Sequence, residues 1–267
     1  RDVVVEKNTI SDAYNGIRVK AVKDGNTTNG NENFNISGNT FIRIRDNPIE
    51  PEFYARNWHI WHNEIIDAHA WFSFDGVGGG HVYIYGNRGR FESRQGERTS
   101  LHHTMGRVLK LSYVSPLPTA KAGEVTPDHP WYVFNNSFFL RCPLIGGAAH
   151  SVNEPDLFGI GPDITRNLTF ANNVFEWCGP EEFDDYICSW IELVRHYRQD
   201  KNDHVTFDAS LSNRADYFED AKRKYRWEKN GICEEAPLFK DGPRGDLKLV
   251  KGSAGLNSAI SLRLEMP

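Results

Sequence analysis

The sequence predicts an all-β fold in which short parallel strands stack on one another as a solenoid. One pattern carries this prediction: an apolar residue, any residue, an apolar residue, two further residues, an asparagine, any residue and an apolar residue. It occurs five times. The copies are Val3-Val5-Asn8-Ile10, Phe34-Ile36-Asn39-Phe41, Trp58-Ile60-Asn63-Ile65, Trp131-Val133-Asn136-Phe138 and Leu168-Phe170-Asn173-Phe175.

The spacing of the copies is the second observation. Asn39, Asn63 and Asn87 follow one another at intervals of 24 residues, which suits one turn of a parallel solenoid. A weaker sixth copy contains Val82, Ile84 and Asn87 but ends in Gly89. Each turn can bury its inward side chains only by stacking on its neighbours.

Composition excludes several other classes of protein. The chain has 31 lysines and arginines against 36 aspartates and glutamates, a formal charge of −5, which excludes an overall basic nucleic-acid binder. No apolar run approaches the roughly 18 residues of a membrane span. The four cysteines form no CxxC pair, which argues against a zinc ribbon or a thioredoxin-like site and leaves one or two disulfides open.

The repeated asparagines are interpreted as structural. At the same corner of every turn, an asparagine amide can donate and accept hydrogen bonds along the stack. Asparagine also tolerates the left-handed backbone of a tight turn. We therefore expect a ladder of asparagines along one corner of the solenoid.

The chain is predicted to be one domain with two structurally different parts. Residues 1–178 form the coils, interrupted by an inserted loop at 91–128. Residues 179–267 form a helical segment and a covering segment of the same domain. Apolar spacings of three and four predict one helix within 183–197 and a second within 216–229. A strand is predicted at 205–207, and the tail at 236–249 is expected to pack over the last coil, because an uncovered edge leaves strand hydrogen bonds unpaired.

The first coil is expected to need a cover of its own. If Val3 is already an inward position, the first coil has an apolar interior and an open strand edge. We expect N-terminal coils upstream of this sequence or a partner chain to cover it. Nothing in the opening residues reads as a signal segment.

The repeat pattern resembles that of right-handed parallel β-helix proteins, many of which are secreted or periplasmic enzymes that act on polysaccharides. The resemblance covers about residues 1–178, and segments 46–52, 79–84 and 109–111 are similar to ones common in bacterial β-helix proteins. It implies a right-handed parallel β-helix, a polysaccharide or oligosaccharide substrate and a secreted or periplasmic location.

Aligning the coils predicts a patch of charged side chains on one outer face. Each coil has a second strand about nine residues after its asparagine, and alternate residues of a strand point outward. This alternation turns Ile49, Phe72 and Leu109 inward. The residues predicted to face outward in neighbouring strands are Arg18, Lys20, Glu50, Glu52, Ser73, Asp75 and Lys110.

Three carboxylates beside one ammonium group indicate functional tuning of pKa values, because crowded like charges are unfavourable unless a cation, a proton or a partner relieves them. The first chemistry that fits is β-elimination on a uronic-acid-containing glycan. In it Glu50, Glu52 and Asp75 hold Ca²⁺, which favours hard oxygen ligands, and Lys110 is the base. Some pectate and alginate lyases with this fold are similar in combining calcium-binding acids with a catalytic lysine. No organic cofactor is predicted.

Further residues are assigned to the substrate. Arg107, His102 or His103 would donate to the leaving oxygen, and His69 would contact the sugar. The inserted loop, which carries His102 and His103, would form a wall of the cleft. Among the tryptophans, Trp61 and Trp71 are candidates for stacking on sugar rings, whereas Trp58 falls in the inward register.

Two alternatives stay open. In glycoside hydrolysis, Glu52 and Asp75 would serve as the acid and as the base or nucleophile, without a metal. The third reading is a noncatalytic β-helix that binds glycans.

Overall fold

The computed structural model describes residues 2–20, 31–52, 54–68, 70–74, 78–90, 107–111, 130–141, 158–160, 168–178 and 205–264. In this part of the chain the protein is mostly β, with parallel sheets and one short α-helix. The all-β prediction is therefore confirmed. No helix among these residues is long and apolar enough to span a bilayer.

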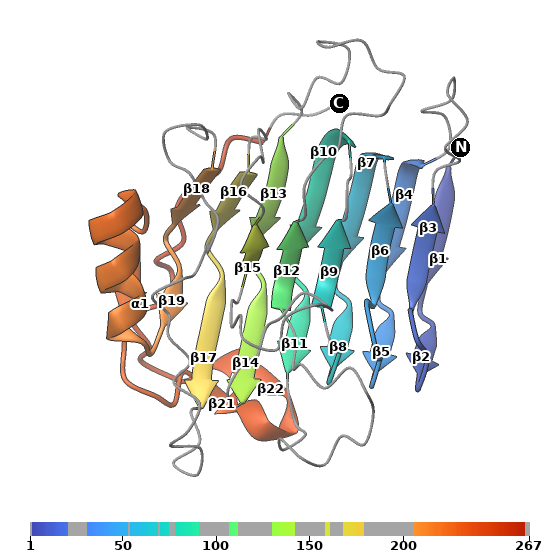
Figure 1. The fold of residues 1–267 in the computed structure, drawn as a ribbon. Coiled ribbons are helices and arrows are strands. Elements are labelled where there is room, and N and C mark those ends of the chain that lie inside the picture. The colour runs from blue at the N-terminus through green and yellow to red at the C-terminus, as the bar shows by residue number, and fades with distance from the viewer. Residues whose placement is uncertain are drawn as a thin grey trace.

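Three parallel sheets, here named A, B and C, make up most of the fold (Figure 1). Sheet A contains β1 (Val3–Glu6), β4 (Glu32–Ser37), β7 (Tyr54–Trp61), β10 (Gly78–Tyr85), β13 (Trp131–Phe134), β16 (Leu168–Ala171) and β18 (Val205–Asp208). Sheet B contains β2 (Thr9–Ser11), β5 (Thr40–Ile42), β8 (Glu64–Ile66), β11 (Arg88–Arg90), β14 (Ser137–Arg141), β17 (Val174–Cys178), β19 (Leu211–Ser212) and β20 (Ile232–Cys233). Sheet C contains β3 (Ile17–Lys20), β6 (Ile49–Glu52), β9 (Ala70–Phe74), β12 (Arg107–Leu111) and β15 (Phe158–Ile160).

The order of the strands explains how these sheets arise from one repeat. From β1 to β17 the described strands fall in sheets A, B and C in rotation, and each new strand pairs in parallel with the strand three earlier. Residues at equivalent places in successive repeats therefore become neighbours. Val5, Ile36 and Ile60 occupy one such column in sheet A, and the column continues through Ile84, Val133, Phe170 and Phe207.

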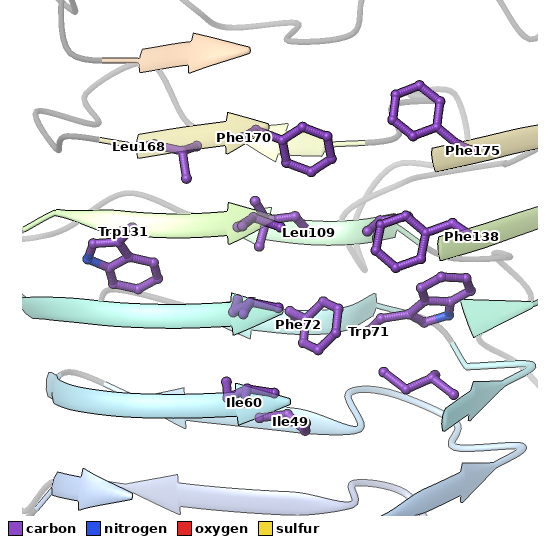
Figure 2. Close-up of a cluster of buried hydrophobic side chains, with 14 of the residues drawn as sticks. Ile49, Ile60, Trp71, Phe72, Leu109, Trp131, Phe138, Leu168, Phe170 and Phe175 are labelled. Atoms are coloured by element: carbon purple, nitrogen blue, oxygen red, sulfur yellow. The ribbon is translucent and has the colours of Figure 1, made fainter. Parts of the chain in front are cut away.

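The core lies between the sheets and is built from these inward columns. Figure 2 shows buried side chains of neighbouring strands stacked in rows. Ile49, Phe72 and Leu109 form the predicted inward column of sheet C, and all three are fully buried. Burying a large apolar side chain contributes about 1.5–3 kcal/mol, so each repeat is held mainly by the repeats on either side of it.

The asparagine ladder is confirmed. Its members are Asn8, Asn39, Asn63, Asn87, Asn136 and Asn173, and they lie between the strands of sheets A and B. In each step the backbone N–H and the Nδ2 of one asparagine both donate to Oδ1 of the next, at 2.9–3.1 Å. From Asn39 onward, Nδ2 also donates to a sheet A carbonyl of the preceding repeat, as Asn63 does to Ile36 at 2.9 Å.

One detail of the ladder differs from the prediction. The left-handed residue is the one before each ladder asparagine, where φ lies between 52° and 63°. These residues are Lys7, Gly38, His62, Gly86, Asn135 and Asn172. The left-handed residue makes the bend, and the following asparagine then directs its amide into the stack.

Gly89 explains why the sixth copy of the pattern is weak. It pairs with Ile65 on one side and with Phe138 on the other, so it occupies an inward position that other repeats fill with a large apolar residue. A Cβ added to Gly89 would overlap Cζ3 of Trp71. The indole of Trp71, from β9, occupies this volume, which excludes Trp71 from stacking on a sugar.

A helical segment closes the C-terminal end of the core. The helix α1 (Ala215–Asp220) continues as the π-helix η2 (Ala221–Tyr225), so the second predicted helix is confirmed but ends at residue 225. Tyr217, Ala221 and Trp227 belong to the core, and the ring of Trp227 lies 4.6 Å from that of Phe207. The predicted strand at 205–207 is confirmed as β18. The first predicted helix, within 183–197, lies outside the described residues.

The buried carboxylate of Glu228 lies at the C-terminal end of the asparagine ladder. Ser210 follows Asn173 in the ladder column, and its backbone N–H donates to Oε2 of Glu228 at 3.0 Å. The hydroxyl of Tyr217 donates to Oε1 of Glu228 at 2.5 Å. Burial raises the pKa of the Glu228 carboxyl, and burial raises the pKa of Tyr217 well above its usual value. The side chain of Glu228 thus supplies the acceptor that a further asparagine would supply.

The tail corrects a prediction. It was expected to pack over the last coil, but β21 (Phe239–Asp241), η3 (Gly242–Arg244) and β22 (Asp246–Leu249) pack on the outer face of sheet B. There Phe239 and Leu247 contact Phe139. The buried carboxylate of Glu176 accepts from the N–H groups of Leu238 and Phe239 at 2.9 and 2.8 Å. The outward-facing Phe139 and Glu176 direct the tail to this face, and burial raises the pKa of Glu176.

The N-terminal end has no comparable cover among the described residues. Its inward side chains pack against the core but are only half-buried, whereas their counterparts in the next repeats are fully buried. These half-buried residues are Val3, Val5, Ile10, Ala13, Ile17 and Val19.

Candidate functional site

The register of sheet C aligns, across four repeats, one row of positions that the sequence predicts to face outward. Arg18 pairs with Glu50, and Lys110 pairs with Ser73. Because Ile49 pairs with Phe72, the next residues along the two strands, Glu50 and Ser73, are also neighbours. The row is therefore Arg18, Glu50, Ser73 and Lys110, and it ends opposite Gly159. We call it the sheet C row.

A second row lies two residues further along the strands. In it Lys20 pairs with Glu52. Asp75, predicted to follow Glu52, lies outside the described residues. Parallel strands are about 4.8 Å apart, so Lys110 lies about 10 Å from Glu50 and two strands away from it, measured between backbones.

Among the described residues, Glu50 is held by Asn15 and Arg18 from the preceding repeat and by Asn47 from its own repeat. Nδ2 of Asn15 donates to Oε2 at 2.7 Å, and Nδ2 of Asn47 donates to Oε1 at 2.8 Å. Nε of Arg18 lies 3.3 Å from Oε2. Glu50 points away from Ile49, as predicted, yet it is only 4 % exposed. A buried carboxylate requires such partners, so these contacts make Glu50 a fixed anchor within the row.

Two buried polar atoms beside this anchor have no hydrogen-bond partner among the described residues. They are Oδ1 of Asn47 and Oγ of Ser73, and both residues are almost completely buried. Buried polar atoms are nearly always hydrogen-bonded, because each unsatisfied one costs about 1–3 kcal/mol.

The other predicted site residues are described only in part. The backbones of Glu52, Arg107 and Lys110 belong to β6 and β12, but their side chains are not among those described. Asp75, His69, His102 and His103 lie outside the described residues. Within the inserted loop predicted at 91–128, β12 is an ordered strand of sheet C. The predicted roles of these seven residues stay predictions.

The predicted calcium site draws on this group of residues. No cluster of three or more histidine, cysteine, aspartate or glutamate side chains that could hold a metal ion occurs among the described residues. Of the three predicted calcium ligands, only the side chain of Glu50 is described, and it is engaged by two amides and a guanidinium. Any hard-oxygen site here would therefore depend mainly on Glu52 and Asp75.

Sequence reasoning missed a stack of aromatic rings on the outer face of sheet A. Trp61 stacks on Tyr85 with ring centroids 6.0 Å apart, and Tyr85 stacks on Phe134 at 5.2 Å. A parallel column places His59 on Tyr83 at 4.7 Å. Burial lowers the pKa of His59. The signal was present in the sequence, because these rings lie two or four residues before a ladder asparagine in successive repeats.

The stacking geometry indicates that these rings have a structural role. Neighbouring rings of the first column are within 11° of parallel, so Tyr85 has an aromatic neighbour on both faces. Trp61 also donates from Nε1 to Oδ1 of Asn35 at 2.6 Å. The column therefore stabilises adjacent repeats. Trp58 is buried in the core, as its inward register predicted.

Comparison of the chain with models of protein families, with curated proteins and with solved structures finds no match.

Proposed function

We propose that the chain is a right-handed parallel β-helix that cleaves a uronic-acid-containing polysaccharide by β-elimination on the outer face of sheet C. The observation that carries the proposal is the sheet C row, in which Arg18, Glu50, Ser73 and Lys110 come from four different repeats. The rotation of strands through three parallel sheets and the asparagine ladder support a β-helix. Right-handed connection is the rule for parallel strands of one sheet.

The elimination assigns a role to each group. The amine of Lys110, in its neutral form, takes the proton from the sugar carbon next to the carboxylate. The electron pair left behind forms a carbon–carbon double bond, and the glycosidic oxygen leaves with a proton from Arg107, His102 or His103. A cationic group near the substrate carboxylate stabilises the charge that develops in the transition state. Ca²⁺ held by the predicted acids Glu50, Glu52 and Asp75 would supply such a charge when bound.

Glycoside hydrolysis is the second candidate, and one observation favours it. Because Glu50 is engaged by Asn15, Asn47 and Arg18, the two acids left for chemistry are Glu52 and Asp75. A pair of carboxylates suffices for hydrolysis, one as the acid and the other as the base or nucleophile. A glycan-binding role without catalysis is the remaining outcome of the same experiment.

Replacement of Lys110 by alanine tests the proposal. On the uronate polymer that the wild type cleaves, Lys110→Ala is expected to lower the rate by at least about a hundredfold, because a positioned base contributes on the order of 10²–10⁴. The readout is the ultraviolet absorbance of the unsaturated product, with and without Ca²⁺.

Lys240→Ala is the matched control. Lys240 is an exposed lysine on β21, in the tail that covers sheet B, and its removal is expected to leave the rate unchanged. Equal rates for Lys110→Ala and the wild type would contradict the assignment of the base. New reducing ends without the absorbance, unaffected by a chelator, would support hydrolysis. Binding of a glycan without cleavage by the wild type would support the noncatalytic role.

We also propose that further coils or a partner chain cover the N-terminal edge, and that the protein acts in the periplasm or outside the cell. The half-buried apolar residues of β1, β2 and β3 support the first point. Native mass and the complete gene sequence test it: a monodisperse monomer whose gene begins at Arg1 would contradict it. Cell fractionation tests the location.

A further inference from the structure

Arg18 lies at one end of the sheet C row. Its side chain is partly exposed, and it contacts the buried carboxylate of Glu50. The side chain of Arg18 is 45 % exposed, whereas the side chain of Glu50, whose carboxylate it contacts through Nε, is 5 % exposed. The guanidinium thus contacts a buried acid on one side and is partly accessible from the outer face of the sheet.

The anchor is fixed because two amides hold it from different repeats. Asn15 lies in the same repeat as Arg18, and Asn47 lies in the same repeat as Glu50. Each donates to a different oxygen of the carboxylate, so Glu50 cannot rotate without losing a hydrogen bond. A guanidinium held through Nε is oriented before any ligand arrives, and its planar fork matches the two oxygens of a carboxylate.

Arg18 is too far from Lys110 to act on the same sugar bond. The row passes from β3 through β6 and β9 to β12, which is three strand spacings, or about 14 Å between backbones. A polymer that contacts both residues would therefore reach Lys110 and Arg18 with different sugar residues. Binding energy from such a remote contact can be used at the reacting centre.

We propose that Arg18 is a distal subsite residue that binds the carboxylate of a uronate several sugars away from the bond that is cleaved. This inference rests on the function proposed above. Glu50, Asn15 and Asn47 are its positioning residues. Binding of a distant carboxylate by Arg18 makes the enzyme favour long acidic chains over short ones and over neutral glycans.

The test measures kcat/KM of Arg18→Gln on oligouronates of increasing length. We expect no change on the shortest oligomer that the wild type cleaves, and a loss on the order of tenfold on oligomers long enough to reach Arg18, which is the scale of one charge-assisted hydrogen-bonded pair. Arg18→Lys keeps the positive charge but not the planar guanidinium, so its kcat/KM on long oligomers is expected to lie between those of Arg18→Gln and the wild type. It also carries the test if Arg18→Gln does not fold.

Arg43→Gln is the matched control. Arg43 also pairs with an acid of a neighbouring repeat, because its Nη2 lies 2.6 Å from Oδ2 of Asp12, but both side chains of this pair are exposed and lie outside sheet C. It is expected to leave kcat/KM unchanged at every length. An equal loss at all lengths for Arg18→Gln, or no loss at any length, would overturn the inference while the wild type still cleaves uronates. A wild type that cleaves no uronate polymer would instead overturn the proposed function.

Discussion

Replacement of Asn63 by alanine is expected to lower the free energy of unfolding by about 4 kcal/mol, because it leaves several buried polar groups unsatisfied at once. Asn63 donates to Oδ1 of Asn87 and to the carbonyl of Ile36, and it accepts from both the backbone N–H and Nδ2 of Asn39. It is 1 % exposed, so water cannot replace these partners. Denaturant unfolding of the purified protein gives the difference.

Asn8→Ala is the matched control for the ladder. Asn8 donates to Asn39 with the same geometry, at 3.0 Å, but it is the first member of the ladder and is exposed. Water can satisfy the groups that its removal leaves, so we expect a loss of about 1 kcal/mol or less. Equal losses for Asn8→Ala and Asn63→Ala would show that the buried ladder does not hold the repeats together.

Replacement of Gly89 by leucine is expected to destabilise the protein by about 3 kcal/mol, since it forces a side chain into a filled volume. The inward position of Gly89 is already occupied by the ring of the fully buried Trp71. Thermal or denaturant unfolding measures the effect.

Gly89→Leu combined with Trp71→Ala provides the control, because it removes the clash and restores the pattern of the other repeats. Each single substitution is expected to be destabilising, whereas the double variant is expected to be more stable than the sum of the two effects predicts. Strictly additive effects would contradict the packing of Trp71 against Gly89.

The sequence predicted those parts of the fold that depend on periodicity. The alternation of apolar residues predicted the inward columns, and the recurring asparagine predicted the ladder. Both predictions follow because stacked repeats place equivalent residues side by side. Ile49, Phe72 and Leu109 could be aligned in this way although 23 and 37 residues separate them. The position of each left-handed residue was not predicted, because a bend can be made by either of two adjacent residues.

Features that depend on contacts outside the repeat were not predicted. The burial of Glu50 depends on Asn15, 35 residues earlier in the chain, and on the turn that carries Asn47. The tail packs on sheet B because of Phe139 and Glu176, which periodicity alone marks only as outward residues. The aromatic stack on sheet A was recoverable, since Trp61 and Tyr85 each lie two residues before a ladder asparagine.

The mass of the products from a panel of uronate and neutral polysaccharides, with and without Ca²⁺, tests the central claim most directly. We expect a uronate polymer to be divided into fragments whose masses sum to that of the substrate, one of them carrying a new double bond. Fragments whose masses together exceed the substrate by one water, or no cleavage of any uronate, would contradict it.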